Sequence, residues 1–157
     1  MREAHQLGLD YALSLCTDEL PAEALDLLAN RLELEWVDAS RLSGTAIGLT
    51  VREPSRDWQA MIKEGFHFTP DLLVLFRIHP DGEGHEQALR LMLRAAQFLL
   101  ERGRDAVLLF NGEHIILQRF QGQLVLNADY GDWTDGFRLV DEIWLSHEWR
   151  SLPSLPL

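Results

Sequence analysis

The chain has 157 residues, and 25 Asp and Glu against 14 Lys and Arg give it a formal net charge of −11. Apolar residues make up 46 % of the sequence, a globular composition that excludes disordered, collagen-like and disulfide-scaffold chains. This length favours one domain. We therefore expect residues 1–157 to form a single unit, with a short N-terminal extension at 1–9 and an irregular, acidic and Trp-rich segment at 128–157.

The charge and the apolar pattern also limit the partners of the chain. An acidic surface repels phosphate groups, so we expect no nucleic acid as a partner. The longest apolar-rich stretch, 88–100, is interrupted by arginines and a glutamine, whereas a membrane span needs about 20 clean residues. No secretory signal is visible, and the lone Cys16 fits a reducing compartment. These features predict a cytoplasmic protein that does not contact a membrane.

Alternating and periodic apolar residues predict the elements of the first half of the chain. Alternation predicts half-buried strands over 11–16 and 47–52. Apolar residues at helical spacing predict a helix over 21–33, and a serine N-cap introduces a shorter helix over 56–64. A continuous apolar run over 72–76 indicates a central strand that is covered on both faces.

The second half begins with the clearest helix, predicted over 86–102. Its polar residues form one narrow stripe that we expect to be solvated: Gln87, Arg90, Arg94, Gln97 and Glu101. Strands follow over 106–110, 114–120 and 124–126. The first two are joined by Asn111-Gly112, the pair that favours a type I′ hairpin turn.

The order of these elements predicts the class of the fold. It indicates an α+β domain with a ferredoxin-like β-α-β-β-α-β antiparallel sheet, two helices on one face, and a C-terminal β-meander that extends the sheet. A fold class does not establish a function, which has to come from particular residues.

Sequence motifs of catalysis are missing, and we expect no catalytic residue, no cofactor and no bound metal. The chain has no Gly-x-Ser-x-Gly elbow, and a phosphate-binding Gly-x-x-x-x-Gly-Lys loop fails because Lys63 is the sole lysine. One alternative stays open at His79–Glu86, where three carboxylates and two imidazoles could hold a divalent cation in a small metal-assisted enzyme. The other interpretation of that segment is a solvated loop before a helix. A self-associating structural protein, held by a sheet edge, is a third possibility.

Aromatic residues among acids make the segment after residue 127 the best candidate for a binding surface. Tyr and Trp are enriched at the energetic centres of protein interfaces. The alternative is that Trp133 folds back over the sheet and that the acids only solvate a loop. We predict that a protein partner is contacted by Asp129, Tyr130, Asp132, Trp133, Asp135, Asp141 and Glu142.

Several strand and turn motifs resemble a known family. They are Ala106–His114 (AVLLFNGEH), Gln123–Asn127 (QLVLN), Asp132-Trp133-Thr134 and Gly65–Pro70 (GFHFTP). The chain is similar in these motifs to Sit-type immunity proteins, found with the swapper-inheritable toxins of myxobacteria and beside other polymorphic toxins. The resemblance implies a cytoplasmic antitoxin that binds one cognate toxin domain and blocks its active site. It assigns no contact residue, because interface residues vary among immunity proteins. A nuclease toxin would suit the acidic chain, since its phosphate-binding cleft would be basic.

Overall fold

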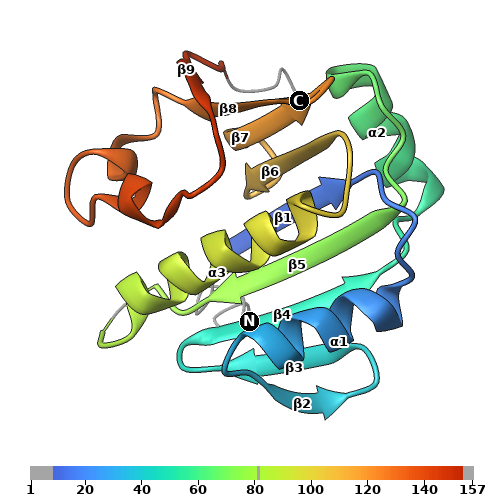
Figure 1. Cartoon of the computed structure of the whole chain (residues 1–157), viewed down its shortest axis with the longest axis vertical. Coiled ribbons are helices and arrows are strands. Elements are labelled where there is room, and N and C mark those ends of the chain that lie inside the picture. The colour runs from blue at the N-terminus through green and yellow to red at the C-terminus, as the bar shows by residue number, and fades with distance from the viewer. Residues whose placement is uncertain (1–8, 81, 154–157) are drawn as a thin grey trace, which may run out of the picture.

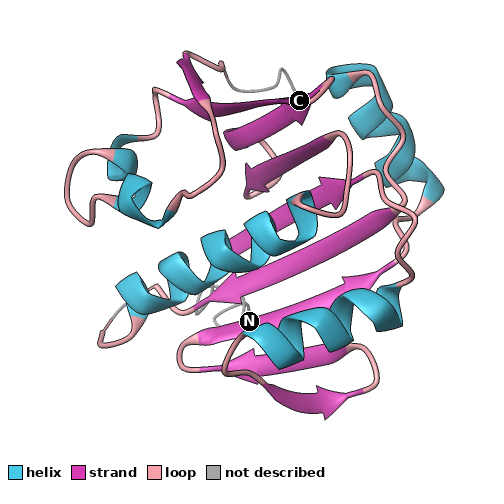
Figure 2. Cartoon of the chain, viewed as in Figure 1, coloured by secondary structure: helices cyan, strands magenta, loops and turns pink. Residues whose placement is uncertain are grey.

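The computed structural model describes residues 9–80 and 82–153. These residues form an α+β fold with three α-helices and one nine-stranded sheet that is mostly antiparallel (Figure 1, Figure 2). The strands are β1 (Leu9–Leu15), β2 (Glu35–Asp38), β3 (Arg41–Gly44), β4 (Ile47–Arg52), β5 (Leu72–Ile78), β6 (Ala106–Phe110), β7 (His114–Phe120), β8 (Gln123–Asn127) and β9 (Glu148–Arg150). The helices are α1 (Pro21–Arg31), α2 (Arg56–Phe66) and α3 (His85–Leu100), with short 3₁₀ turns η2 (Gly131–Trp133) and η3 (Leu139–Glu142).

The sheet has the strand order β2-β3-β4-β5-β1-β6-β7-β8-β9. Every neighbouring pair is antiparallel except β8 and β9, which run parallel. Strand β1 lies in the interior of the sheet, where Leu13 stands opposite Val74 of β5 and Leu108 of β6. The strand that begins the described chain is therefore completed by two strands that come much later in the sequence.

The helices lie on both faces of the sheet. Helices α1 and α3 pack their apolar side chains on the face that carries Leu13, Val74 and Leu108. Successive residues of a strand point to opposite faces. Val107 and Leu109 therefore face the other way, where they pack with α2 in a second, smaller core. Among residues 9–80 and 82–153, helix α2 covers the β6–β7 part of its face, and a groove remains over β3, β4, β5 and β1.

The expected fold agrees with this architecture in its class and in its main elements. The strands predicted over 11–16, 47–52, 72–76 and 106–110 are β1, β4, β5 and β6, and the meander β6–β7–β8 extends them. The Asn-Gly turn is as predicted, because φ is 53° at Asn111 and 77° at Gly112. The six-element arrangement is not the whole topology, since the hairpin β2–β3 is inserted between α1 and β4, and α2 is inserted between β4 and β5.

The ends of the chain are more ordered than expected where they are described. Leu9 already belongs to β1, so the predicted extension over 1–9 is one residue too long, and residues 1–8 lie outside the described part. The segment 128–157, predicted to be irregular, contains η2, η3 and β9. Residues 154–157 of this segment lie outside the described residues. Its order comes from contacts with α3 and β8, which are distant in sequence.

Candidate functional site

The acidic segment, residues 129–142, leaves the sheet after β8 and crosses to α3 before the chain returns as β9 (Figure 1). Its η3 turn packs along α3, and η2 packs against η3. Both turns are short and rich in Asp and Glu, so packing from their own residues alone would hold them weakly. Trp133 and Leu139 of the two turns are buried in the main core, and side chains from α3 and from the end of β8 fix the rest of the segment.

Two arginines of α3 reach the acidic segment. Arg90 donates a hydrogen bond to the Phe137 carbonyl, and its guanidinium lies 3.4 Å from a Glu142 carboxylate oxygen. Arg94 Nε lies 3.6 Å from the other oxygen of the same carboxylate. These positions belong to the polar stripe that was expected to face water. The prediction of a wholly solvated stripe is therefore wrong, because part of the stripe contacts the acidic segment.

Gln97 of α3 makes the most hydrogen bonds to this part of the chain, and its side chain is 0 % exposed. Its amide nitrogen donates to the Glu142 carbonyl at 2.9 Å and to the Leu93 carbonyl at 3.1 Å. Its amide oxygen accepts from the backbone N–H groups of Trp144 and Leu145, at 2.8 and 3.2 Å. A buried amide is tolerated when both its ends are bonded. Gln97 thus closes the C-terminal end of the acidic segment on α3.

A second buried amide, Asn127 at the end of β8, closes the other end. Its nitrogen donates to the carbonyls of Ile115 (2.6 Å) and Leu152 (2.9 Å). Its oxygen accepts from the backbone N–H of Asp129 (3.0 Å) and of Leu152 (2.9 Å). Gln97 and Asn127 therefore hold the acidic segment at both ends, which fixes the shape of its surface.

Tyr130 links the acidic segment to the central strand. Its ring packs edge-on against Trp133, with ring centroids 5.5 Å apart. Its hydroxyl lies close to that of Tyr11 and to the Asp132 carboxylate. Burial raises the pKa of Tyr11 to about 12 and raises the pKa of Tyr130 further above its ordinary value, because a buried phenolate is poorly solvated. Tyr130 is half-buried and serves the packing of the segment.

Two of the predicted contact residues do not offer their side chains to a partner. Trp133 is 1 % exposed and is packed in the main core, which is the alternative in which it folds back over the sheet. The Glu142 side chain is 24 % exposed and is engaged by the two α3 arginines. Both residues hold the acidic segment together, so we remove them from the contact surface.

The remaining predicted acids are accessible to different degrees. Asp135 is exposed and has no ion-pair partner within residues 9–80 and 82–153. Asp141 is exposed and lies 3.6 Å from the Arg138 guanidinium. Asp129 is exposed and accepts a hydrogen bond from the Ser151 hydroxyl, whereas Asp132 is half-buried beside Tyr130. We call Asp129, Asp132, Asp135 and Asp141 the accessible acids. All four belong to one segment that is fixed at both ends.

The histidine-containing loop before α3 makes intramolecular contacts. His85 Nδ1 donates to the His79 carbonyl at 2.7 Å, and Glu86 pairs with Arg90 at 3.0 Å. In the part of the chain that the structure describes, no group of three or more His, Cys, Asp and Glu residues is placed to hold a metal ion. Asp81 of the expected cluster lies outside that part.

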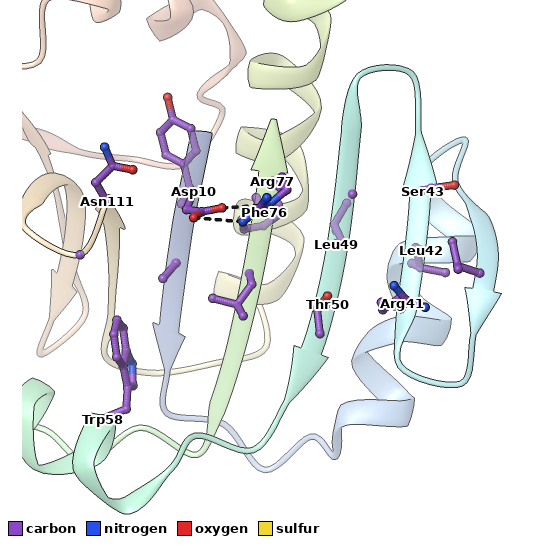
Figure 3. A pocket seen from close by; sticks show the side chains of 16 residues that line it. Asp10, Arg41, Leu42, Ser43, Leu49, Thr50, Trp58, Phe76, Arg77 and Asn111 are labelled. Atoms are coloured by element: carbon purple, nitrogen blue, oxygen red, sulfur yellow. Dashed lines mark hydrogen bonds and ion pairs between the residues drawn. The ribbon is translucent and has the colours of Figure 1, made fainter. Parts of the chain in front are cut away.

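A groove on the open face of the sheet is a candidate site that the sequence interpretation missed (Figure 3). It has a volume of about 910 Å³ and crosses β3, β4, β5 and β1. Trp58 of α2 stands at one end, where its indole N–H donates to the buried Ser14 hydroxyl at 2.7 Å. A signal for this groove was present in β4, where Gly48 and Thr50 place small side chains opposite the buried face.

No helix in the described ranges is long and apolar enough to cross a membrane. No curated protein and no solved structure matches the chain. The model of the SitI3-like family matches residues 9–137, which include β1 to β8, all three α-helices and most of the acidic segment. This match confirms the resemblance to Sit-type immunity proteins. The chain therefore belongs to the SitI3-like family.

Proposed function

We propose that this chain is a cytoplasmic immunity protein that binds a cognate protein toxin and blocks its active site. The family match over residues 9–137 is the observation that carries the proposal. The chain then acts by occupying a surface of the toxin and performs no chemical reaction, so it needs neither a cofactor nor a metal.

We assign the contact with the toxin to the accessible acids. They belong to a chain with a net charge of −11. The hydrogen bonds of Gln97 and Asn127 hold the acidic segment in one conformation. A surface that is already ordered loses little conformational entropy on binding. An anionic surface suits a basic partner, and a nuclease toxin would have such a surface where it binds phosphates. In that case the carboxylates take the place of substrate phosphates.

Growth of cells tests the function directly. The chain is co-expressed with the toxin domain encoded beside its gene, and the expected result is rescue of growth. With purified proteins, we expect a one-to-one complex whose association rate falls as salt rises, because salt screens the steering between acidic and basic surfaces. Absence of binding to that toxin would reject the proposal.

Charge reversal tests the surface. Asp135→Arg combined with Asp141→Arg is expected to weaken binding and to leave thermal stability nearly unchanged, since both side chains are exposed. The matched control is Asp26→Arg with Glu64→Arg, which changes the net charge equally at exposed positions of α1 and α2. Equal affinities of the two double variants would place the interface elsewhere on the chain.

A further inference from the structure

We propose that the outer edge of the sheet at β2 pairs with an extended, basic strand of the toxin. This inference rests on the proposed function, because its occupant is the same protein partner. It does not depend on the acidic segment, which follows β8 near the other end of the strand order. Three features of β2 support it: its unpaired edge, its exposed apolar side chains and its unpaired acids.

Strand β2 is the first strand in the order of the sheet. One of its sides pairs with β3, and no strand within residues 9–80 and 82–153 pairs with the other side (Figure 1). Strands β3, β4 and β5 separate it from β1, where the described chain begins. An edge strand presents backbone N–H and C=O groups that another extended segment can bond. Main-chain hydrogen bonds of this kind bind a peptide as an added strand.

Two neighbouring apolar side chains of β2 are exposed. Trp36 is 49 % exposed and Val37 is 51 % exposed. Trp36 stands opposite the buried Leu42 of β3, whereas Val37 lies at a register shift and has no partner residue on β3. Apolar side chains on a sheet edge favour pairing with another chain. An added strand would therefore gain apolar contacts besides its main-chain hydrogen bonds.

The charges at this edge select the kind of strand that fits. Glu33 and Glu35 are exposed, and neither has an ion-pair partner in the described ranges. Asp38 is already paired with Arg41, with a nitrogen and an oxygen 2.7 Å apart. The free charge beside the strand is therefore negative. Opposite charges on paired strands stabilise the pairing, so basic side chains on the added strand suit these two acids.

A second copy of this chain fits the same edge poorly. If β2 paired antiparallel with β2 of another copy over all four residues, Glu35 would stand opposite Asp38 at both ends. Like charges directly opposite each other destabilise a strand pair, and each copy carries a net charge of −11. Short, charged and bulged edge strands are features by which proteins avoid pairing with themselves. The acids thus disfavour self-association and favour a basic partner.

Charge reversal beside the strand tests the inference. The probe is the purified toxin domain encoded beside the gene. We expect Glu33→Arg combined with Glu35→Arg to weaken its binding by about tenfold or more, because attraction becomes repulsion. Asp26→Arg with Glu64→Arg is the matched control, since it changes the net charge equally at exposed positions of α1 and α2 and should bind nearly like the wild type.

A second substitution tests the apolar contact. Trp36→Thr removes the exposed ring and keeps a residue type that favours strands. We expect it to weaken toxin binding by about tenfold or more, because Trp side chains contribute strongly to interfaces. The matched control is Trp149→Thr, which removes a 43 % exposed ring from β9 at the opposite edge and should leave the affinity unchanged. Thermal unfolding of each variant identifies losses that come from instability.

Hydrogen exchange of the backbone amides distinguishes strand pairing from contact through side chains alone. In the complex of the wild type with the toxin domain, exchange over residues 35–38 should slow, because an added strand bonds the free N–H groups of β2. Unchanged exchange over these residues would overturn the inference.

The outcomes separate this inference from the proposed function. If the wild type binds the toxin and both β2 variants bind as well as their controls, β2 is not part of the interface, and the immunity function stands. If the wild type does not bind that toxin, the proposed function fails and this inference fails with it. A wild-type dimer that Trp36→Thr dissociates would also overturn the inference, because a second copy would then occupy the edge.

Discussion

Replacing Gln97 by methionine is the sharpest test of how the acidic segment is held. Methionine has nearly the length and volume of glutamine but can neither donate nor accept the same hydrogen bonds. The change therefore fills the same space on α3 and removes the hydrogen bonds that join α3 to residues 142–145. These are the bond to the Glu142 carbonyl and those from the Trp144 and Leu145 N–H groups.

The magnitude follows from these three bonds. A buried hydrogen bond contributes about 1 kcal/mol net, and more when its loss leaves a partner unsatisfied. We expect Gln97→Met to lower the free energy of unfolding by about 3 kcal/mol. This is a large share of the roughly 5–15 kcal/mol by which folded proteins are typically stable. The Arg94→Met control introduces the same side chain one turn earlier. It breaks a 3.6 Å contact of a half-exposed arginine, for which we expect a loss below about 0.5 kcal/mol.

Urea unfolding measures the loss of stability in both variants, provided that the m-value is the same as in the wild type. Hydrogen exchange of the backbone amides locates the effect. Exchange at residues 142–145 should speed up in Gln97→Met, while that of β1 and β5 changes only with global stability. A loss under about 1 kcal/mol, with exchange at 142–145 unchanged, would refute the view that this amide holds the segment.

Three further predictions concern packing, pH and the C-terminal strand. Gly103→Ala should lower the free energy of unfolding by about 2 kcal/mol, because the added Cβ would lie 2.6 Å from Leu15 Cδ1. The control Gly48→Ala places its Cβ in free space, so its thermal unfolding should be nearly that of the wild type. The folded pKa of Tyr11, raised from 10.0 to about 12, means that the unfolded chain releases this proton first. Stability is therefore full below pH 10.0 and falls as the pH rises toward 12; urea midpoints across that range should show the fall, and a smaller one in Tyr11→Phe. Asn127→Ala should accelerate amide exchange in β9 and weaken toxin binding, and unchanged exchange there would show that the amide does not hold the strand.

The main strands could be predicted because one buried face leaves a strong alternation in the sequence. Strand β2 could not, because all four of its residues are exposed and no apolar alternation marks it. Its partner β3 has four residues and ends at a glycine, which favours a turn assignment. The two strands exist because β4 offers a free edge to β3, and β3 then offers one to β2, a tertiary effect that local pattern does not record.

The contact with a partner at the acidic segment stays a prediction, and the structure reports only how its side chains are oriented. Composition does not distinguish a Trp that faces a partner from one that faces the core. Trp133 turned inward, and Gln97 proved buried although helical periodicity placed it on a polar stripe. Both outcomes depend on the acidic segment lying along α3, and the sequence of α3 alone cannot report what later residues will cover it.

The interior position of β1 has a consequence for how the protein folds during its synthesis. Its partners β5 and β6 are synthesised long after it, and a folding reaction that joins distant parts of a chain is slow. Until the chain has been synthesised up to Phe110, one edge of this apolar strand is unpaired and can associate with other unfolded chains. We expect nascent chains that stop before β6 to aggregate or to recruit chaperones. The appearance of folded protein would then be limited by how fast β1 is enclosed between β5 and β6.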